Sequence, residues 1–191
     1  MDLHKFGIKL FALDAQNIDI LKFIPMYHRW IQQNALEDLL IDVADYSHVP
    51  AGPGVMLIAH EGNYALDETG HERGVVYYSK HPVAGALPER FARVASKTLK
   101  AAQLMKEDAE LGDALKLPGN DLQFFANDRL VAPNTDAAYG ELEPALKTFL
   151  DRLYAGAPYT LARERDPKER LSVRVRADGA VALETLLARL N

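Results

Sequence analysis

The residues best suited to chemistry fall in two neighbouring polar stretches that a Pro/Gly-rich turn separates. In the second stretch His60 stands directly before Glu61, and a histidine beside a carboxylate can serve as an acid–base pair. Asp42 and Tyr46, in the first stretch, could complete such a site. These four residues form the predicted catalytic group, and their types indicate a hydrolase or lyase that uses acid–base or metal-assisted chemistry.

The positions of the histidines limit a metal site. If residues 39–46 and 55–60 pair as a hairpin, His60 lies near Leu39 or Leu40, and His48 lies at the turn, most of the hairpin's length away at about 3.3 Å per residue. Further candidate ligands, which could gather a divalent cation or form a solvated acidic loop, are Glu61, Asp67, Glu68 and His71. Since no spacing there matches His-Glu-x-x-His, the sequence predicts no metal site and identifies no cofactor.

Four other residues are predicted to contact a ligand. Tyr27 and Trp30 belong to the first helical segment, where they could line a binding site or pack in the core. Tyr64 follows the polar stretch at His60 and is a further aromatic residue that could contact a ligand. Arg174 lies on the basic face of the last strand, which could receive an anionic ligand. The acids that could instead neutralise this basic face by cross-strand pairing are Glu164, Asp166, Glu169 and Asp178.

Length and composition set the class of protein. The chain has 191 residues, 48% of them hydrophobic, so it can bury a core. It contains no cysteine, which excludes disulfides, thiolate metal sites and cysteine nucleophiles. A net charge of −5 argues against binding to nucleic acid, and no apolar run is long enough for a membrane span. The N-terminal residues lack the apolar core of an export signal, so we expect a cytoplasmic protein.

Hydrophobic periodicity indicates the elements that must position these residues. A strand at residues 9–13 precedes an amphipathic helix at 19–34, which Pro25 either kinks or restarts. Apolar residues on both faces of 55–60 predict a strand covered on both sides, and residues 61–73 are predicted to be a polar connection. The remaining predictions are strands at 39–46, 74–78, 122–126, 159–165 and 170–176, and helices at 88–108, 135–154 and 181–190.

The order of these elements repeats. Each half, 1–118 and 119–191, follows the order strand, helix, strand, strand, helix, with one additional strand in the first half. The predicted fold class is therefore α+β, with two pseudo-repeated β-α-β-β-α halves that form one mostly antiparallel sheet with helices packed on it. We expect a single compact domain at 1–191, whose halves arose by internal duplication or share their order by chance.

Residues 23–32, 42–64 and 127–135 resemble stretches of a family of bacterial hypothetical proteins of about this length. That resemblance covers nearly the whole chain and implies no catalytic residue. The element order is similar to that of tandem strand-helix-strand-strand domains of the DNA gyrase inhibitor-like type. The similarity implies that a small amphipathic ligand binds in a groove between the halves.

The leading prediction is therefore a non-enzymatic protein that binds a small ligand or a protein partner between its halves. The alternative is the hydrolase or lyase centred on His60 and Glu61. A third interpretation is a homodimer that the strand with Tyr77 and Tyr78, or the first helix, holds together.

Overall fold

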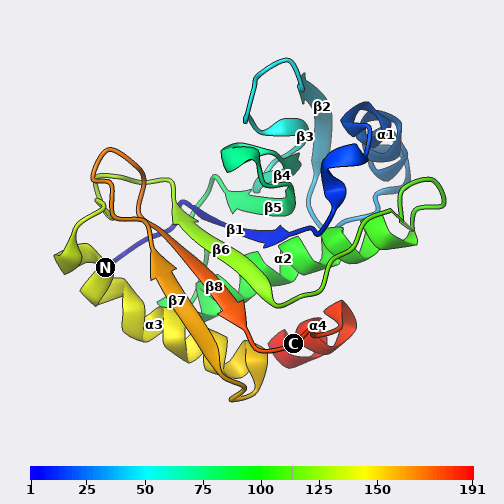
Figure 1. The fold of residues 1–191 in the computed structure, drawn as a ribbon. Helices are drawn as coiled ribbons and strands as arrows, with labels where there is room; N and C mark the ends of the chain where they lie inside the picture. The colour runs from blue at the N-terminus through cyan, green and yellow to red at the C-terminus, as the bar shows by residue number, and fades with distance from the viewer. Residues whose placement is uncertain (113) are drawn as a thin grey trace.

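The computed structural model describes residues 1–112 and 114–191 and places the strands of this part of the chain in one sheet. The strands run in the order β2-β3-β4-β5-β1-β6-β8-β7, and neighbouring strands are antiparallel throughout (Figure 1). Their bounds are β1 Phe6–Phe11, β2 Leu40–Tyr46, β3 Gly54–Ala59, β4 Gly62–Asp67, β5 Gly74–Ser79, β6 Asp121–Ala126, β7 Tyr159–Arg163 and β8 Ser172–Ala177. The predicted α+β class with an antiparallel sheet is confirmed.

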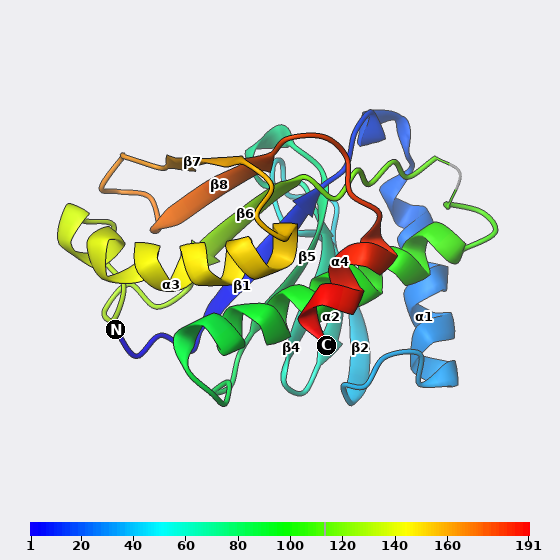
Figure 2. The same cartoon turned by 90° about the horizontal axis from the view of Figure 1, so that it is seen from below.

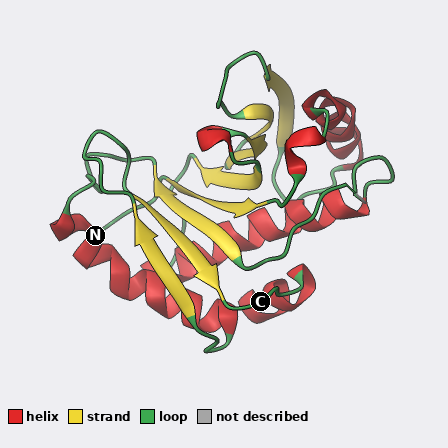
Figure 3. Ribbon diagram, in the orientation of Figure 1, coloured by secondary structure: helices red, strands yellow, loops and turns green. Residues whose placement is uncertain are grey.

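The helices gather on one face of the sheet, as Figure 3 shows. They are α1 Phe23–Gln33, α2 Leu87–Glu107, α3 Asp136–Tyr154 and α4 Leu183–Leu190. Of these, α2 packs on β1 and β5 and also contacts α3 and α4, so the three helices lie together beneath the sheet in Figure 2. Helix α1 packs instead on β2 and β3. In the described part of the chain, no helix combines the length and apolar character needed to cross a membrane.

Local signals explain where the helices begin. The segment predicted as one helix over 19–34 is divided: a short 3-10 turn at Ile20–Lys22 comes first, and α1 begins at Phe23. Pro25 therefore lies in the first turn of α1, where a backbone donor has no partner within the helix. Helix α3 begins after Thr135, whose hydroxyl accepts a hydrogen bond from the backbone N–H of Ala138 at 3.2 Å.

The prediction of a polar connection over 61–73 is wrong, because these residues contain strand β4. Its Tyr64 and Leu66 point into the core, whereas Asn63, Ala65 and Asp67 point to the opposite face. Asn63 and Asp67 are each only 8% exposed, and they bond to Tyr78 and Lys9. These polar side chains make the sequence of β4 look like a loop. They are buried because their partners lie on other strands.

The face of the sheet opposite the helices is called the open face. No helix of the described residues packs on this face. The side chains of β3 are nevertheless buried on both faces of the strand, with Ile58 partly exposed, so the predicted two-sided burial of β3 is confirmed. The apolar cluster of the open face, Met56, Ala65, Val76 and Phe125, consists of strand residues that shield one another. The open face is consequently apolar at this cluster, and polar residues lie around it.

The two predicted halves meet inside the sheet, where β1 pairs with β6. On their other sides β1 pairs with β5 and β6 pairs with β8, and one continuous core contains residues of both halves. The internal duplication itself stays a prediction. Because β5, the strand with Tyr77 and Tyr78, is paired with β4 and β1, its backbone is not free to pair with a second copy of the chain.

Candidate functional site

Two adjoining cavities on the helix side of the molecule form what we call the helix-side groove. The larger, of about 430 Å³, lies between α2, α4 and the segment at Glu37, and α2 and α4 run beside each other in Figure 2. The smaller, of about 290 Å³, lies between α2 and the end of β5. Glu37, Ser96 and Lys97 line both cavities. The larger volume falls in the range of about 300–1,000 Å³ that is typical of small-molecule sites.

A buried polar network forms the floor of the groove. The carboxylate of Asp38, only 2% exposed, accepts a hydrogen bond of 2.5 Å from the hydroxyl of Tyr64 and another from Nζ of Lys97. The Lys97 ammonium also lies 5.2 Å from the ring centroid of Tyr77, whose ring packs against that of Tyr64. Asp38 therefore fixes both a tyrosine and the lysine that faces the two cavities.

Burial raises the pKa of the phenols of Tyr64 and Tyr77, and the nearby carboxylate of Asp38 raises both further. The folded protein holds both phenols neutral at pH values where the unfolded chain ionises them, above about pH 10. The stability that they contribute is thus fully present below that pH and is lost as the pH rises beyond it.

We expect the free energy of unfolding, measured by urea denaturation, to fall as the pH rises above about 10. Tyr64→Phe removes one of the shifted phenols, so its free energy of unfolding should fall less steeply over the same range. Equal slopes for Tyr64→Phe and the wild type would contradict this account of Tyr64.

His60 and Glu61 form the turn between β3 and β4, at the mouth of the groove. His60 donates its backbone N–H to the carbonyl of Leu39 at 2.9 Å, which confirms the predicted position of His60 in the hairpin. Its Nε2 lies 3.8 Å from Oε1 of Glu61, and the two side chains are 59% and 52% exposed. The ring of His60 stacks on that of His81, with centroids 5.1 Å apart, and both His81 and Glu61 line the smaller cavity.

The other two predicted catalytic residues do not join this pair. Asp42 is exposed on β2, and its carboxylate accepts a hydrogen bond from the adjacent backbone N–H of Val43. Tyr46 pairs with Gly54 at the far end of the hairpin, roughly 20 Å from His60 at about 3.3 Å per residue. The predicted group of four therefore does not converge, because the strand direction separates its members.

The acidic loop predicted after His60 does not gather either. Glu61 and Glu68 flank opposite ends of β4, so that strand holds apart the side chains that the sequence places in one loop. Within residues 1–112 and 114–191, no three or more His, Cys, Asp or Glu side chains are grouped so that they could hold a metal ion.

Two predicted ligand contacts on α1 are core residues. Tyr27 is fully buried and Trp30 is 6% exposed, and their rings pack edge to face with centroids 5.4 Å apart. Their burial gives no support to contact with a ligand and favours the packing interpretation. Tyr64 is also buried, yet it lines the larger cavity from below.

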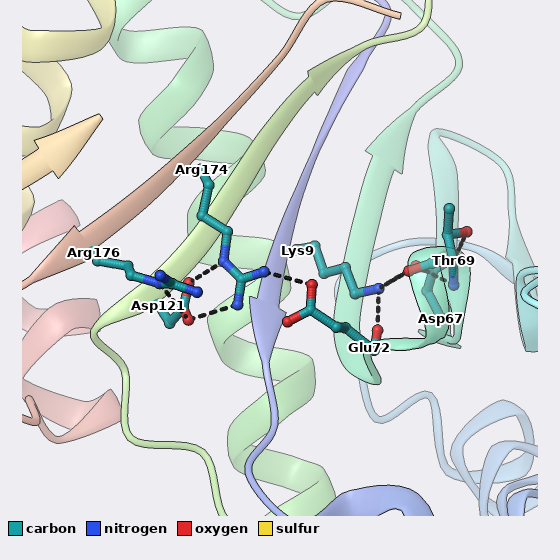
Figure 4. Close-up of polar contacts among 7 residues, drawn as sticks. All are labelled: Lys9, Asp67, Thr69, Glu72, Asp121, Arg174 and Arg176. Atoms are coloured by element: carbon teal, nitrogen blue, oxygen red, sulfur yellow. Dashed lines mark hydrogen bonds and ion pairs between the residues drawn. The ribbon is translucent and has the colours of Figure 1, made fainter. Parts of the chain in front are cut away.

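Arg174, the fourth predicted contact, lies on the open face and is engaged by carboxylates. Its guanidinium donates two hydrogen bonds of 2.7 Å to Asp121 and one of 2.6 Å to Glu72 (Figure 4). It also lies over the ring of Phe11. The hydrogen bonds that Arg174 donates to Asp121 and Glu72 raise its pKa. The prediction that acids neutralise Arg174 is therefore confirmed, but the predicted acids are wrong. The acids come from β6 and from the turn before β5 rather than from the last hairpin.

The sequence interpretation missed Asp38 and Lys97. Asp38 stands in an ordinary polar connection before β2, and Lys97 stands among the residues that the helical pattern assigns to solvent. No local motif links them, because α2 brings Lys97 to Asp38 from 59 positions away. The one sequence feature that points toward this network is Tyr64, because it lies close to the polar stretch at His60.

Comparison with models of known protein families gives no match, and comparison with curated proteins gives none either. We therefore infer the function of this chain from the geometry of its own residues.

Proposed function

We propose that the protein binds a small polar organic molecule in the helix-side groove without transforming it. The observation that carries this proposal is the position of the larger cavity. It lies between α2, from the first half of the chain, and α4, from the second. The likeness in element order to tandem strand-helix-strand-strand domains implies a ligand between the halves, and a cavity between α2 and α4 supports this proposal.

The lining of the groove favours a ligand that both donates and accepts hydrogen bonds. Lys97 and Lys100 present ammonium groups, and Glu37 and Glu184 present carboxylates. Lys97 is already paired with Asp38, so the groove offers no strong excess of positive charge. A polar molecule with balanced charge fits this lining better than a multiply charged anion does.

The acid–base alternative has less geometric support. General acid–base catalysis needs groups that converge on one reacting atom, and water should be restricted around them. His60 and Glu61 are instead more than half exposed, and Asp42 and Tyr46 lie on other parts of the hairpin. One observation supports acid–base catalysis. Glu61 and His81 both line the smaller cavity, where they could contact a bound molecule.

The proposal is tested by a fragment library screened by ligand-observed NMR against the wild type and two variants. Ser96 lines both cavities, so a bulky Ser96→Trp side chain should block them, and we expect the binding of most hits to be lost. Lys106→Trp places the same side chain on an exposed site of the same helix and serves as the matched control. Hits that bind Ser96→Trp as well as they bind Lys106→Trp would contradict the proposal.

A further inference from the structure

A separate cavity of about 270 Å³ lies on the open face of the sheet, away from the helix-side groove. Its floor is apolar and consists of Ala65, Val76 and the ring of Phe125. Its polar residues include Tyr78, Asn127 and Arg170. We call it the open-face pocket.

The position of Gly7 shapes this pocket. Gly7 lies on β1 between Tyr78 of β5 and Phe125 of β6. A Cβ atom at Gly7 would lie 2.3 Å from Cζ of Phe125 and 2.8 Å from Cβ of Tyr78. The missing side chain therefore lets the aromatic ring of Phe125 lie across β1, where it contributes to the flat apolar floor.

Arg170 is the unusual group of this pocket. Its guanidinium lies 3.8 Å from the ring centroid of Phe125, and its Nη1 donates to Oδ1 of Asn127 at 3.0 Å. Within the described residues, no carboxylate lies within ion-pair distance of it, in contrast to Arg174, which has two such partners. Burial lowers the pKa of Arg170, and the carboxylates of Asp67 and Glu169, which act on it without forming an ion pair, offset only part of this effect.

The charges around the pocket favour a single negative charge on the ligand. Lys9, a buried cation on this face, is bonded to Asp67 at 2.5 Å, so these two charges compensate each other. Arg170 is then the cation of this pocket that has no carboxylate within ion-pair distance among the described residues. The carboxylate of Asp67 also lines the pocket beside its partner Lys9, so this pair supplies no positive charge for a second negative charge on the ligand.

Tyr78 adds a further hydrogen-bond donor. Its hydroxyl oxygen accepts a hydrogen bond of 2.8 Å from the amide of Asn63, which leaves the hydroxyl proton free to be donated. A planar guanidinium fork and a phenolic hydroxyl above an apolar floor are complementary to a carboxylate on a flat apolar body.

We propose that the open-face pocket binds a small organic monocarboxylate, with the carboxylate on Arg170 and the apolar body over Phe125 and Val76. This site lies on the opposite face of the sheet from the helix-side groove and does not depend on the function proposed for that groove.

The test titrates benzoate into ¹⁵N-labelled protein and follows the amide shifts. We expect shifts at Ala65, Val76 and Phe125, and Arg170→Gln should weaken binding by at least about tenfold, as the loss of a charge-assisted hydrogen bond does. Arg165→Gln changes an exposed arginine of the same connection and should bind benzoate like the wild type. Arg170→Lys keeps the positive charge but lacks the planar guanidinium, so it should bind benzoate with intermediate affinity. If Arg170→Gln does not fold, Arg170→Lys takes its place in the comparison with the wild type.

Two neutral or differently charged probes complete the test. Benzamide keeps the ring without the charge, and phosphate keeps an anion without the ring, so both should bind more weakly than benzoate. Equal binding of benzoate to Arg170→Gln and the wild type would overturn the proposal. Benzoate shifts confined to the helix side, or phosphate binding as tight as that of benzoate, would overturn it as well.

Discussion

Lys9→Met is expected to lower the free energy of unfolding by about 3–5 kcal/mol, the range found when one partner of a buried ion pair is removed. Lys9 is 2% exposed, and its Nζ donates to Asp67 at 2.5 Å and to the carbonyls of Glu72 and Thr69 at 2.6 and 3.3 Å (Figure 4). Methionine fills a similar volume but leaves the Asp67 carboxylate, 12% exposed, without a cation. Urea denaturation of the variant measures the loss.

Two controls separate the lost ion pair from a general effect of the substitution. Lys5→Met replaces an exposed lysine just before β1 and should change the free energy of unfolding by less than about 0.5 kcal/mol. The double variant Lys9→Met/Asp67→Asn removes the unpaired charge and should be more stable than Lys9→Met alone. A loss for Lys9→Met as small as that for Lys5→Met would show that the contacts of Lys9 contribute little.

Asp38→Ala is expected to cost about 2–3 kcal/mol of unfolding free energy, because a buried donor that loses its partner costs about 1–3 kcal/mol. The substitution leaves the hydroxyl of Tyr64 buried without its acceptor. Lys97 loses its carboxylate too, but its side chain is 31% exposed, and water can replace part of that interaction. The cost is therefore smaller than that expected for Lys9→Met.

A double-mutant cycle with Tyr64→Phe tests whether Asp38 acts through the tyrosine. Once Tyr64 lacks its hydroxyl, Asp38→Ala should cost less than it does in the wild type. Asp42→Ala, at an exposed carboxylate on β2, is the matched control and should be close to neutral. Strictly additive costs for Asp38→Ala and Tyr64→Phe would contradict the proposed network.

Much of the fold could be predicted because hydrophobic periodicity is a local property. The helix predicted over 88–108 is α2 at Leu87–Glu107, and the strand predicted over 122–126 is β6 at Asp121–Ala126. Strand β4 could not be recognised, because its Asn63 and Asp67 look like loop residues until Tyr78 and Lys9 are brought beside them. Such pairings join residues that are distant in sequence, which a local pattern does not report.

The candidate site was harder to predict than the fold for the same reason. Pairing of a hairpin correctly places His60 beside Leu39, but it also separates His60 from Tyr46. The groove floor depends on α2 packing against the sheet, which brings Lys97 to Asp38 and Tyr64. Arg170 likewise becomes a distinctive residue only when the fold brings it over Phe125 and away from carboxylates.

The central claim, that the helix-side groove binds a small molecule, is tested most directly by the crystal structure of the protein soaked with the strongest hit of the fragment screen. The account predicts electron density for the fragment between α2 and α4, in contact with Lys97 and Ser96. Density for the fragment elsewhere on the molecule, with the groove filled by water alone, would contradict it.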